Sequence, residues 1–435
     1  MNQDFLKKNE KIISLILIFT ILFSYFLGFY FQENSAGGAI VDFVNTKRNL
    51  ITFKSHSFIE SIKLTASTNE EIFKSTRTPG FYIFNKYFNP FALEVENHKS
   101  FWTVMTLLIP LLFFFNLKIK YPIENRLILT IISSLILLSP YLRSSAYWGN
   151  EENFGILMVA FSAFFLQLYL KSNEKINKNC YLILLTVFSS LSVYSDQKLI
   201  IIPIISFIYI FFSKQNKLDK FLLVILYLIF SIPFIYLIKL WGNIVPTGDG
   251  IQRKIGSQLS LHHFLFSISI MAFYLFPCLV LINNKKELLF NILRNKINLF
   301  LTIIFFFILI YFIFFFDLEN MYRLGGGVFH KLSKEVTDNI YYQKFILSVI
   351  FIISWILLLI FSNKNFFNFI LLLFFPIFSL IISPALFQEY FDPLIYFMIF
   401  IFLDKKFEFS LKRVLFIFFY LVLFLFISLK HYHSI

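Results

Sequence analysis

The 435-residue chain is 58% hydrophobic and 15% charged, with a mean hydropathy of +0.74. A water-soluble globule of this composition would lack enough polar surface to cover itself, which excludes a soluble fold. The formal net charge of +14 falls in small clusters between apolar runs and forms no continuous patch, so no nucleic-acid partner is predicted. We expect an all-α integral membrane protein that forms a single polytopic domain over residues 1–435, with membrane lipid as its solvent.

The apolar runs predict about thirteen transmembrane helices, because each run approaches the length that crosses a hydrocarbon core of about 30 Å. Lys and Arg recur in every second short loop, beginning with Lys7, Lys8 and Lys11 before the first span. The positive-inside rule then places the N-terminus in the cytoplasm and the longer loops on the external, periplasm-like face. The membrane that we expect is a bacterial inner (plasma) membrane. The predicted spans lie near 11–31, 101–117, 127–142, 154–170, 180–195, 199–213, 221–241, 264–283, 298–316, 344–362, 366–384, 392–403 and 413–429.

The first external loop, residues 32–100, is long enough to carry a function of its own. Apolar residues recur at helical spacing between Val41 and Leu64, which predicts amphipathic helices at the membrane interface. Glu33 and Asp42 are candidate general bases, because a carboxylate beside an apolar wall can take a proton from a hydroxyl. Each is alternatively a solvated loop carboxylate. Arg77 opens the turn RTPGFY and is a candidate phosphate ligand.

The second external loop carries paired carboxylates, Glu151 and Glu152, just before a predicted span. They either complement the dipole of that helix or bind a substrate. We interpret the preceding Tyr147 and Trp148 as aromatic belt residues at the membrane interface.

Asp196 interrupts an apolar hairpin between two predicted spans. An ionisable residue at this depth is costly, so Asp196 either pairs with Lys198 or forms the wall of a buried site. Farther along, FQEYFDP (387–393) places Glu389 and Asp392 at membrane depth, where the same cost applies.

Two later external loops, 242–263 and 317–343, combine glycine with cations and aromatic residues. Free backbone N–H groups beside cations suit a phosphate. His262 and His263 lack the companions of a metal site, so no metal is predicted. With Arg77, the candidate phosphate ligands are Arg253, Lys254 and Arg323.

Several segments, in chain order, resemble the GT-C membrane glycosyltransferases, in particular the dolichyl-phosphate-glucose α-1,2-glucosyltransferases. RTPGFY (77–82) is similar to the family's threonine-proline-glycine-leucine-tyrosine segment. WGNIVPTGDG (241–250) resembles its tryptophan-glycine and glycine-aspartate run. HKLSKEVTDNIYYQKF (330–345) is similar to its histidine-to-tyrosine stretch before a span, and FQEYFDP to its phenylalanine-arginine-tyrosine-proline ending.

The resemblance implies a GT-C-like fold and inverting transfer of a sugar from a polyprenyl-phosphate donor, without a metal or other cofactor. The acceptor would be a hydroxyl of a lipid-linked glycan, a glycolipid or another envelope glycoconjugate on the external face. Glu33 or Asp42 would act as base, and the basic residues would stabilise the departing phosphate. The implied sugar-binding or acceptor-binding residues are Glu151, Glu152, Asp196, Trp241, Asp249, His263, His330, Glu389 and Asp392.

Two other classes stay open at this point. A transporter or flippase would use intramembrane acids and broken helices as a substrate path. The segment lengths contain no internal repeat, and the polar residues concentrate on one face, which favours the glycosyltransferase. A lipid-linked polymer ligase or polymerase would share the external site and the type of donor.

Overall fold

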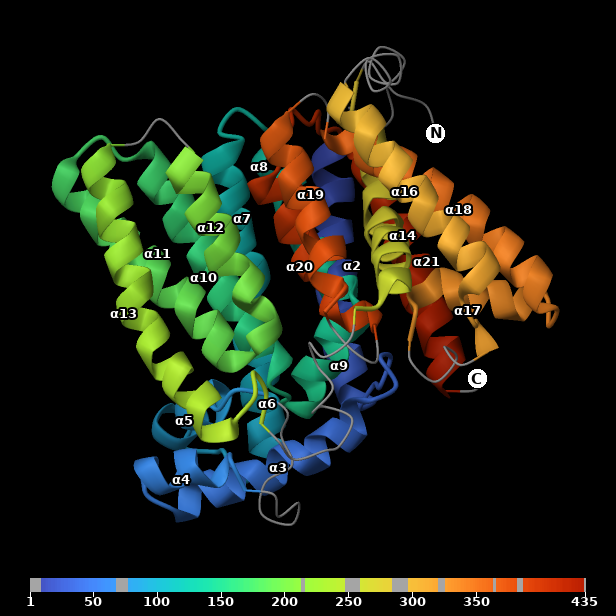
Figure 1. The fold of residues 1–435 in the computed structure, drawn as a ribbon. Helices are drawn as coiled ribbons and strands as arrows, with labels where there is room; N and C mark the ends of the chain where they lie inside the picture. The colour runs from blue at the N-terminus through green and yellow to red at the C-terminus, as the bar shows by residue number, and fades with distance from the viewer. Residues whose placement is uncertain are drawn as a thin grey trace. The chain divides into compact units, whose positions relative to one another are not determined.

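The computed structural model describes residues 9–67, 77–212, 216–246, 259–283, 296–319, 325–362, 365–381 and 386–433. Within these ranges the regular structure is helical, apart from an isolated β-bridge between Gly325 and Leu386. The chain divides into two compact units (Figure 1). The first comprises residues 1–253 and 410–435, and the second comprises residues 254–409.

Long apolar helices form the body of the first unit. In it α10 packs against α7 and α11, α13 packs against α11, and α21 packs against α8 and α9. Their bounds are α2 (Glu10–Tyr30), α6 (Val95–Thr106), α7 (Leu108–Lys120), α10 (Glu152–Lys171), α11 (Lys175–Ser195), η2 (Gln197–Ile200), α12 (Ile201–Phe212), α13 (Lys217–Trp241) and α21 (Leu411–His433).

One predicted span, 127–142, is a sharply bent helix. The part formed by α8 (Arg126–Ser134) and η1 (Leu135–Leu138) meets α9 (Pro140–Trp148) at an angle of 68°. Pro140 has no N–H to continue the hydrogen-bond ladder, and Ser139 Oγ accepts a bond from Leu142 N at 3.1 Å as the cap of α9. The bend therefore follows from the Ser-Pro pair in the sequence.

The first long loop folds into helices, as the spacing of its apolar residues predicts. Residues 41–64 form most of α3 (Ala39–Ser55) and all of α4 (Phe58–Leu64), and α5 (Gly80–Phe88) follows. Phe43 and Phe53 of α3 are buried, whereas Val41 and Val44 are exposed. Figure 1 shows α3, α4 and α5 gathered at one end of α10, α11 and α13.

The second unit is centred on α14, which packs against α16, α17, α18 and α19. A stretch of short helical segments, η6, α20 and the π-helix η7, follows α19. The bounds are α14 (Leu261–Cys278), η4 (Leu279–Leu281), α16 (Lys296–Phe315), α17 (Gly327–Val336), α18 (Ile340–Ser362), α19 (Phe366–Ser379), η6 (Gln388–Tyr390), α20 (Leu394–Phe397) and η7 (Met398–Phe402).

Nine helices of the described residues are long and apolar enough to cross a membrane, or ten if the bent pair is one span. This part of the chain is therefore an all-α membrane protein. The predicted spans 199–213 and 366–384 correspond to the shorter helices α12 and α19, and 392–403 corresponds to α20 and η7. The total of thirteen spans stays a prediction.

The two ends of α10 provide a test of the fold in the membrane. Lys63 in α4 and Lys175 at the start of α11 are exposed, and α4 and the start of α11 lie toward opposite ends of α10 (Figure 1). In a background without the native thiols (Cys180→Ser, Cys278→Ala), we expect Lys63→Cys and Lys175→Cys to react with an impermeant maleimide from opposite sides of the membrane. Labelling of both from one side would contradict the arrangement of the first unit.

Candidate functional site

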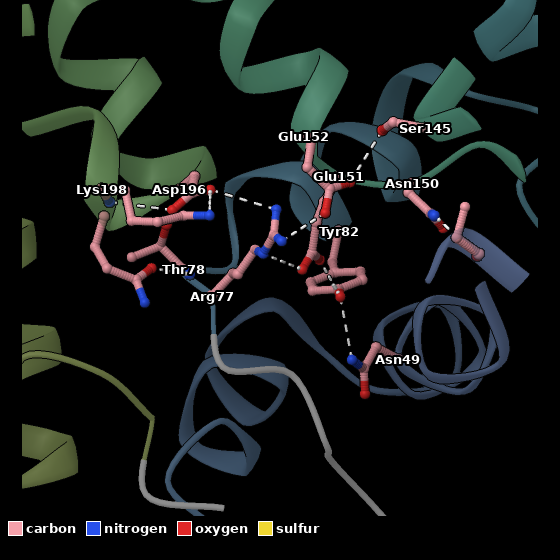
Figure 2. A network of polar contacts seen from close by, with 12 residues as sticks. Asn49, Arg77, Thr78, Tyr82, Ser145, Asn150, Glu151, Glu152, Asp196 and Lys198 are labelled. Atoms are coloured by element: carbon pink, nitrogen blue, oxygen red, sulfur yellow. Dashed lines mark hydrogen bonds and ion pairs between the residues drawn. The ribbon is translucent and has the colours of Figure 1, made fainter. Parts of the chain in front are cut away.

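The main polar cluster of the first unit is built around Arg77 (Figure 2). Arg77 Nε lies 3.1 Å from Glu151 Oε1, Nη2 lies 2.5 Å from Glu152 Oε1, and Nη1 lies 3.3 Å from Asp196 Oδ2. Lys198 Nζ lies 3.2 Å from the same oxygen of Asp196. We call these five residues the Arg77 network. It brings together three segments that the sequence places on one side of the membrane.

The turn after Arg77 is fixed against the end of α11. Thr78 Oγ1 donates to Val193 O at 2.8 Å, and Thr78 N donates to Gln197 Oε1 at 3.2 Å. A Cβ at Gly80 would lie 2.2 Å from Tyr194 O, so this close approach of two backbones requires glycine. The threonine and glycine of the RTPG turn thus hold Arg77 beside Asp196.

Helices from the first and second loops complete the surroundings of the network. The hydroxyl of Tyr82 in α5 donates a hydrogen bond to Glu151 Oε2. The same hydroxyl accepts a hydrogen bond from Asn49 Nδ2 of α3, at 3.1 Å. Ser145 Oγ in α9 donates to Glu152 Oε2 at 2.9 Å. Figure 2 shows Tyr82 and Ser145 reaching the two carboxylates from different helices, and Asn49 contacting Tyr82.

Two carboxylates of the network, Glu151 and Asp196, have pKa values shifted in opposite directions. Burial raises the pKa of Glu151 to about 7, against the opposing effect of the Arg77 charge. Burial also acts to raise the pKa of Asp196, but the charges of Lys198 and Arg77 and the hydrogen bonds from Lys198 lower it below its usual value. Near neutral pH, Glu151 therefore exchanges a proton while Asp196 stays ionised.

Glu33, a predicted base, forms a separate buried ion pair. Arg143 Nε lies 3.0 Å from Glu33 Oε1 and Nη2 lies 2.6 Å from Oε2, and Ser35 Oγ donates to Oε1 at 2.6 Å. Arg143 is 2% exposed and Glu33 is 6% exposed. Both oxygens of Glu33 are thus occupied within the protein.

Asp42, the other predicted base, lies in the first turn of α3 with an exposed side chain. It precedes Asn49 by two helical turns, roughly 10 Å along the axis, so both residues lie on the same side of α3. Since Asn49 contacts Tyr82, this side of α3 faces the Arg77 network.

An apolar cavity of about 520 Å³ adjoins the same turn. Side chains of α4, α5, α11 and α13 line it, among them Ile62, Ile83 and Leu237. Pro79 and Gly80 also line it, directly after Arg77 in the chain. One short turn therefore contributes both to the polar network and to the wall of an apolar cavity.

The remaining predicted site residues are distributed over both units. Trp241 is buried at the end of α13 and donates Nε1–H to Thr65 Oγ1 at 2.8 Å. In the second unit, His263 Nδ1 lies 3.2 Å from Ser379 O, and His330 Nδ1 lies 2.9 Å from Gly325 O. Also in that unit, Glu389 is half-buried and Asp392 is 4% exposed. Four predicted residues lie outside the described part of the chain: Asp249, Arg253, Lys254 and Arg323.

The interpretation of Tyr147 and Trp148 as belt residues is wrong. Tyr147 is buried and donates to Tyr25 O at 2.5 Å, and Trp148 is buried and donates to Glu33 O at 3.2 Å. The bent α9 places both aromatic rings inside the first unit. Their hydroxyl and indole N–H groups satisfy backbone carbonyls there.

Sequence reasoning missed three residues of these clusters: Arg143, Tyr82 and Asn49. A signal existed for Arg143, because a cation beside an apolar span implies a buried partner. Tyr82 and Asn49 have no such signal, since their contacts join helices that are distant in the sequence. Among the described residues, no group of three or more His, Cys, Asp or Glu side chains is placed to hold a metal ion.

No protein-family model, no curated protein and no solved structure matches the chain.

Removing one partner of the Glu33 pair should destabilise the first unit. In Arg143→Met, the Glu33 carboxylate would stay buried without its cation, which costs about 3–5 kcal/mol. We expect a clear fall in the unfolding temperature of the detergent-purified protein. Glu60→Gln removes an exposed carboxylate of α4 and should leave this temperature unchanged. An Arg143→Met variant with the wild-type unfolding temperature would show that the pair is unimportant for stability.

The raised pKa of Glu151 predicts a pH dependence of stability. Between the usual glutamate pKa of 4.5 and about 7, the folded protein retains a proton that the unfolded chain has released. Glu151 therefore contributes stability at acidic pH that is lost as pH rises through this window. The unfolding temperature of wild type relative to Glu151→Gln should fall across the window and level off above it. A constant difference would contradict the raised pKa.

Proposed function

We propose that the protein is a membrane glycosyltransferase that moves a sugar from a polyprenyl-phosphate donor to a hydroxyl acceptor. The observation that carries the proposal is the RTPG turn, which joins the Arg77 network to the apolar cavity. A lipid-linked sugar likewise combines a polar and an apolar part, with hydroxyl groups at one end and hydrocarbon at the other. Its acceptor would be a glycan or glycolipid of the cell envelope.

The carboxylates of the Arg77 network suit a sugar or acceptor. Ionised carboxylates are hydrogen-bond acceptors only, so they bind hydroxyl donors. In this proposal Glu152 and Asp196 hold hydroxyl groups, and Arg77 fixes the positions of the carboxylates. The network contains two cations and three carboxylates, so Arg77 is already neutralised. In this proposal Arg77 therefore does not serve as a ligand of the donor phosphate.

The base of the proposed reaction is Asp42. Glu33 is buried and bound by Arg143 at both oxygens, whereas Asp42 is exposed to solvent, two helical turns before Asn49 in α3. The acceptor oxygen attacks the anomeric carbon, Asp42 takes the hydroxyl proton, and the bond to the phosphate oxygen breaks with its electron pair leaving on the phosphate. Attack opposite the leaving group inverts the anomeric centre. Glu33 acts as a positioning residue for the first loop.

The alternative, a transporter or flippase, is supported by the bent span α8–α9 and by the proton-exchanging Glu151. The position of the Arg77 network favours the transferase. Its acids lie where α10 begins and where α11 ends, and transport sites of broken-helix carriers lie near the bilayer midplane. We place the network on the periplasmic face of a bacterial inner membrane, in line with the basic loops at the other side.

Sugar transfer by the reconstituted protein tests the proposal. With radiolabelled polyprenyl-phosphate sugars and membrane glycolipid extracts, wild type should form a labelled product. Asp42→Asn should reduce the rate about 100-fold or more, since it removes the base, without changing the unfolding temperature. Glu60→Gln is the matched control and should retain the wild-type rate. Full activity of Asp42→Asn would refute its role, and no turnover of any donor would favour the transporter.

A further inference from the structure

A second apolar cavity, of about 270 Å³, lies between α11, α12 and α13. Its walls include Ile204 and Phe207 from α12 and Phe230 from α13. Tyr194, near the end of α11, lines both this cavity and the larger one beside the RTPG turn. We call the cavity beside the turn the proximal cavity and the second one the distal cavity.

Tyr194 is held firmly between the two cavities. Its hydroxyl donates to Phe230 O of α13 at 2.6 Å. Its ring meets Phe234 edge to face, with the ring centroids 6.2 Å apart and an angle of 76° between the planes. A hydrogen bond in apolar surroundings is strong because no water competes for it. The ring therefore forms a partition that is fixed to the neighbouring helix.

The occupant that suits the proximal cavity is the hydrocarbon chain of the donor. The proximal cavity begins at Pro79 and Gly80, directly after Arg77, so a chain lodged there has its head beside the Arg77 network. Its lining is aliphatic and aromatic, without a charged side chain. The distal cavity continues along α11 and α13 from the far side of Tyr194.

We propose that Tyr194 is a specificity residue that limits the length of isoprenoid chain held by the protein. The units nearest the phosphate occupy the proximal cavity, and the Tyr194 ring excludes the following units from the distal cavity. The inference rests on the proposed function, because it assigns the chain to the same lipid-linked donor. The ring itself, rather than its hydroxyl group, provides the barrier.

Binding of prenyl phosphates without a sugar tests this inference independently of catalysis. Farnesyl phosphate and undecaprenyl phosphate are titrated separately against the protein in phosphatidylcholine nanodiscs, and bound ligand is measured by native mass spectrometry. Tyr194→Ala should join the cavities and raise the affinity for undecaprenyl phosphate about tenfold, because two or more further hydrocarbon groups become buried. Its affinity for farnesyl phosphate should be unchanged.

Two further variants distinguish the effect of losing the Tyr194 ring from a general loss of structure. Tyr194→Phe keeps the ring and should retain the wild-type ratio of the two affinities. In the Tyr194→Ala background, Ile204→Trp refills the distal cavity and should restore that ratio. A Tyr194→Ala variant with an unchanged ratio, or a refilled variant that stays selective for the long chain, would overturn the inference. In those cases the proposed function stands, whereas wild type that binds neither prenyl phosphate would refute both.

Discussion

The first unit depends on the pairing of Arg77 with three carboxylates. A buried charge without a partner costs several kcal/mol, so each member of the network requires the others to be present and correctly placed. These members come from the first loop, from the start of α10 and from the turn after α11. Their mutual requirement fixes the first loop onto the ends of two spans. The proximal cavity exists because α4 and α5 are held there.

The Glu33–Arg143 pair performs a similar task at the other end of the first loop. It fastens the exit from α2 to the bent helix α9, and Trp148 adds a hydrogen bond to the Glu33 carbonyl. The loop is therefore anchored at its beginning by one buried ion pair and near its middle by another. Asp42 lies between these anchors, on a helix whose position both of them determine.

Composition and apolar spacing were sufficient to predict the membrane class, the helical first loop and most long spans. These features depend on local sequence and on the length of apolar runs. The bend of α8–α9 was not predicted, although Ser139-Pro140 carries its signal, because the apolar run continues across it. The roles of Tyr147 and Trp148 depend on that bend, which explains why they were misjudged.

For the candidate site, the sequence identified Arg77, Glu151, Glu152 and Asp196 separately but could not show that they meet. Arg77 and Asp196 are far apart in the chain, and their contact depends on the backbone approach at Gly80. No local pattern records such a contact. The sequence also suggested equal roles for Glu33 and Asp42, and burial of the former in an ion pair distinguishes them.

Because the pKa of Glu151 is raised to about 7, ligand binding at the Arg77 network can be coupled to proton uptake or release. With Glu151 ionised the network has one excess negative charge, and with Glu151 protonated it is neutral. A ligand that binds these two forms with different affinity must take up or release protons as it binds. The calorimetric enthalpy would then vary with the ionisation enthalpy of the buffer. The affinity of the network for such a ligand would thus depend on pH.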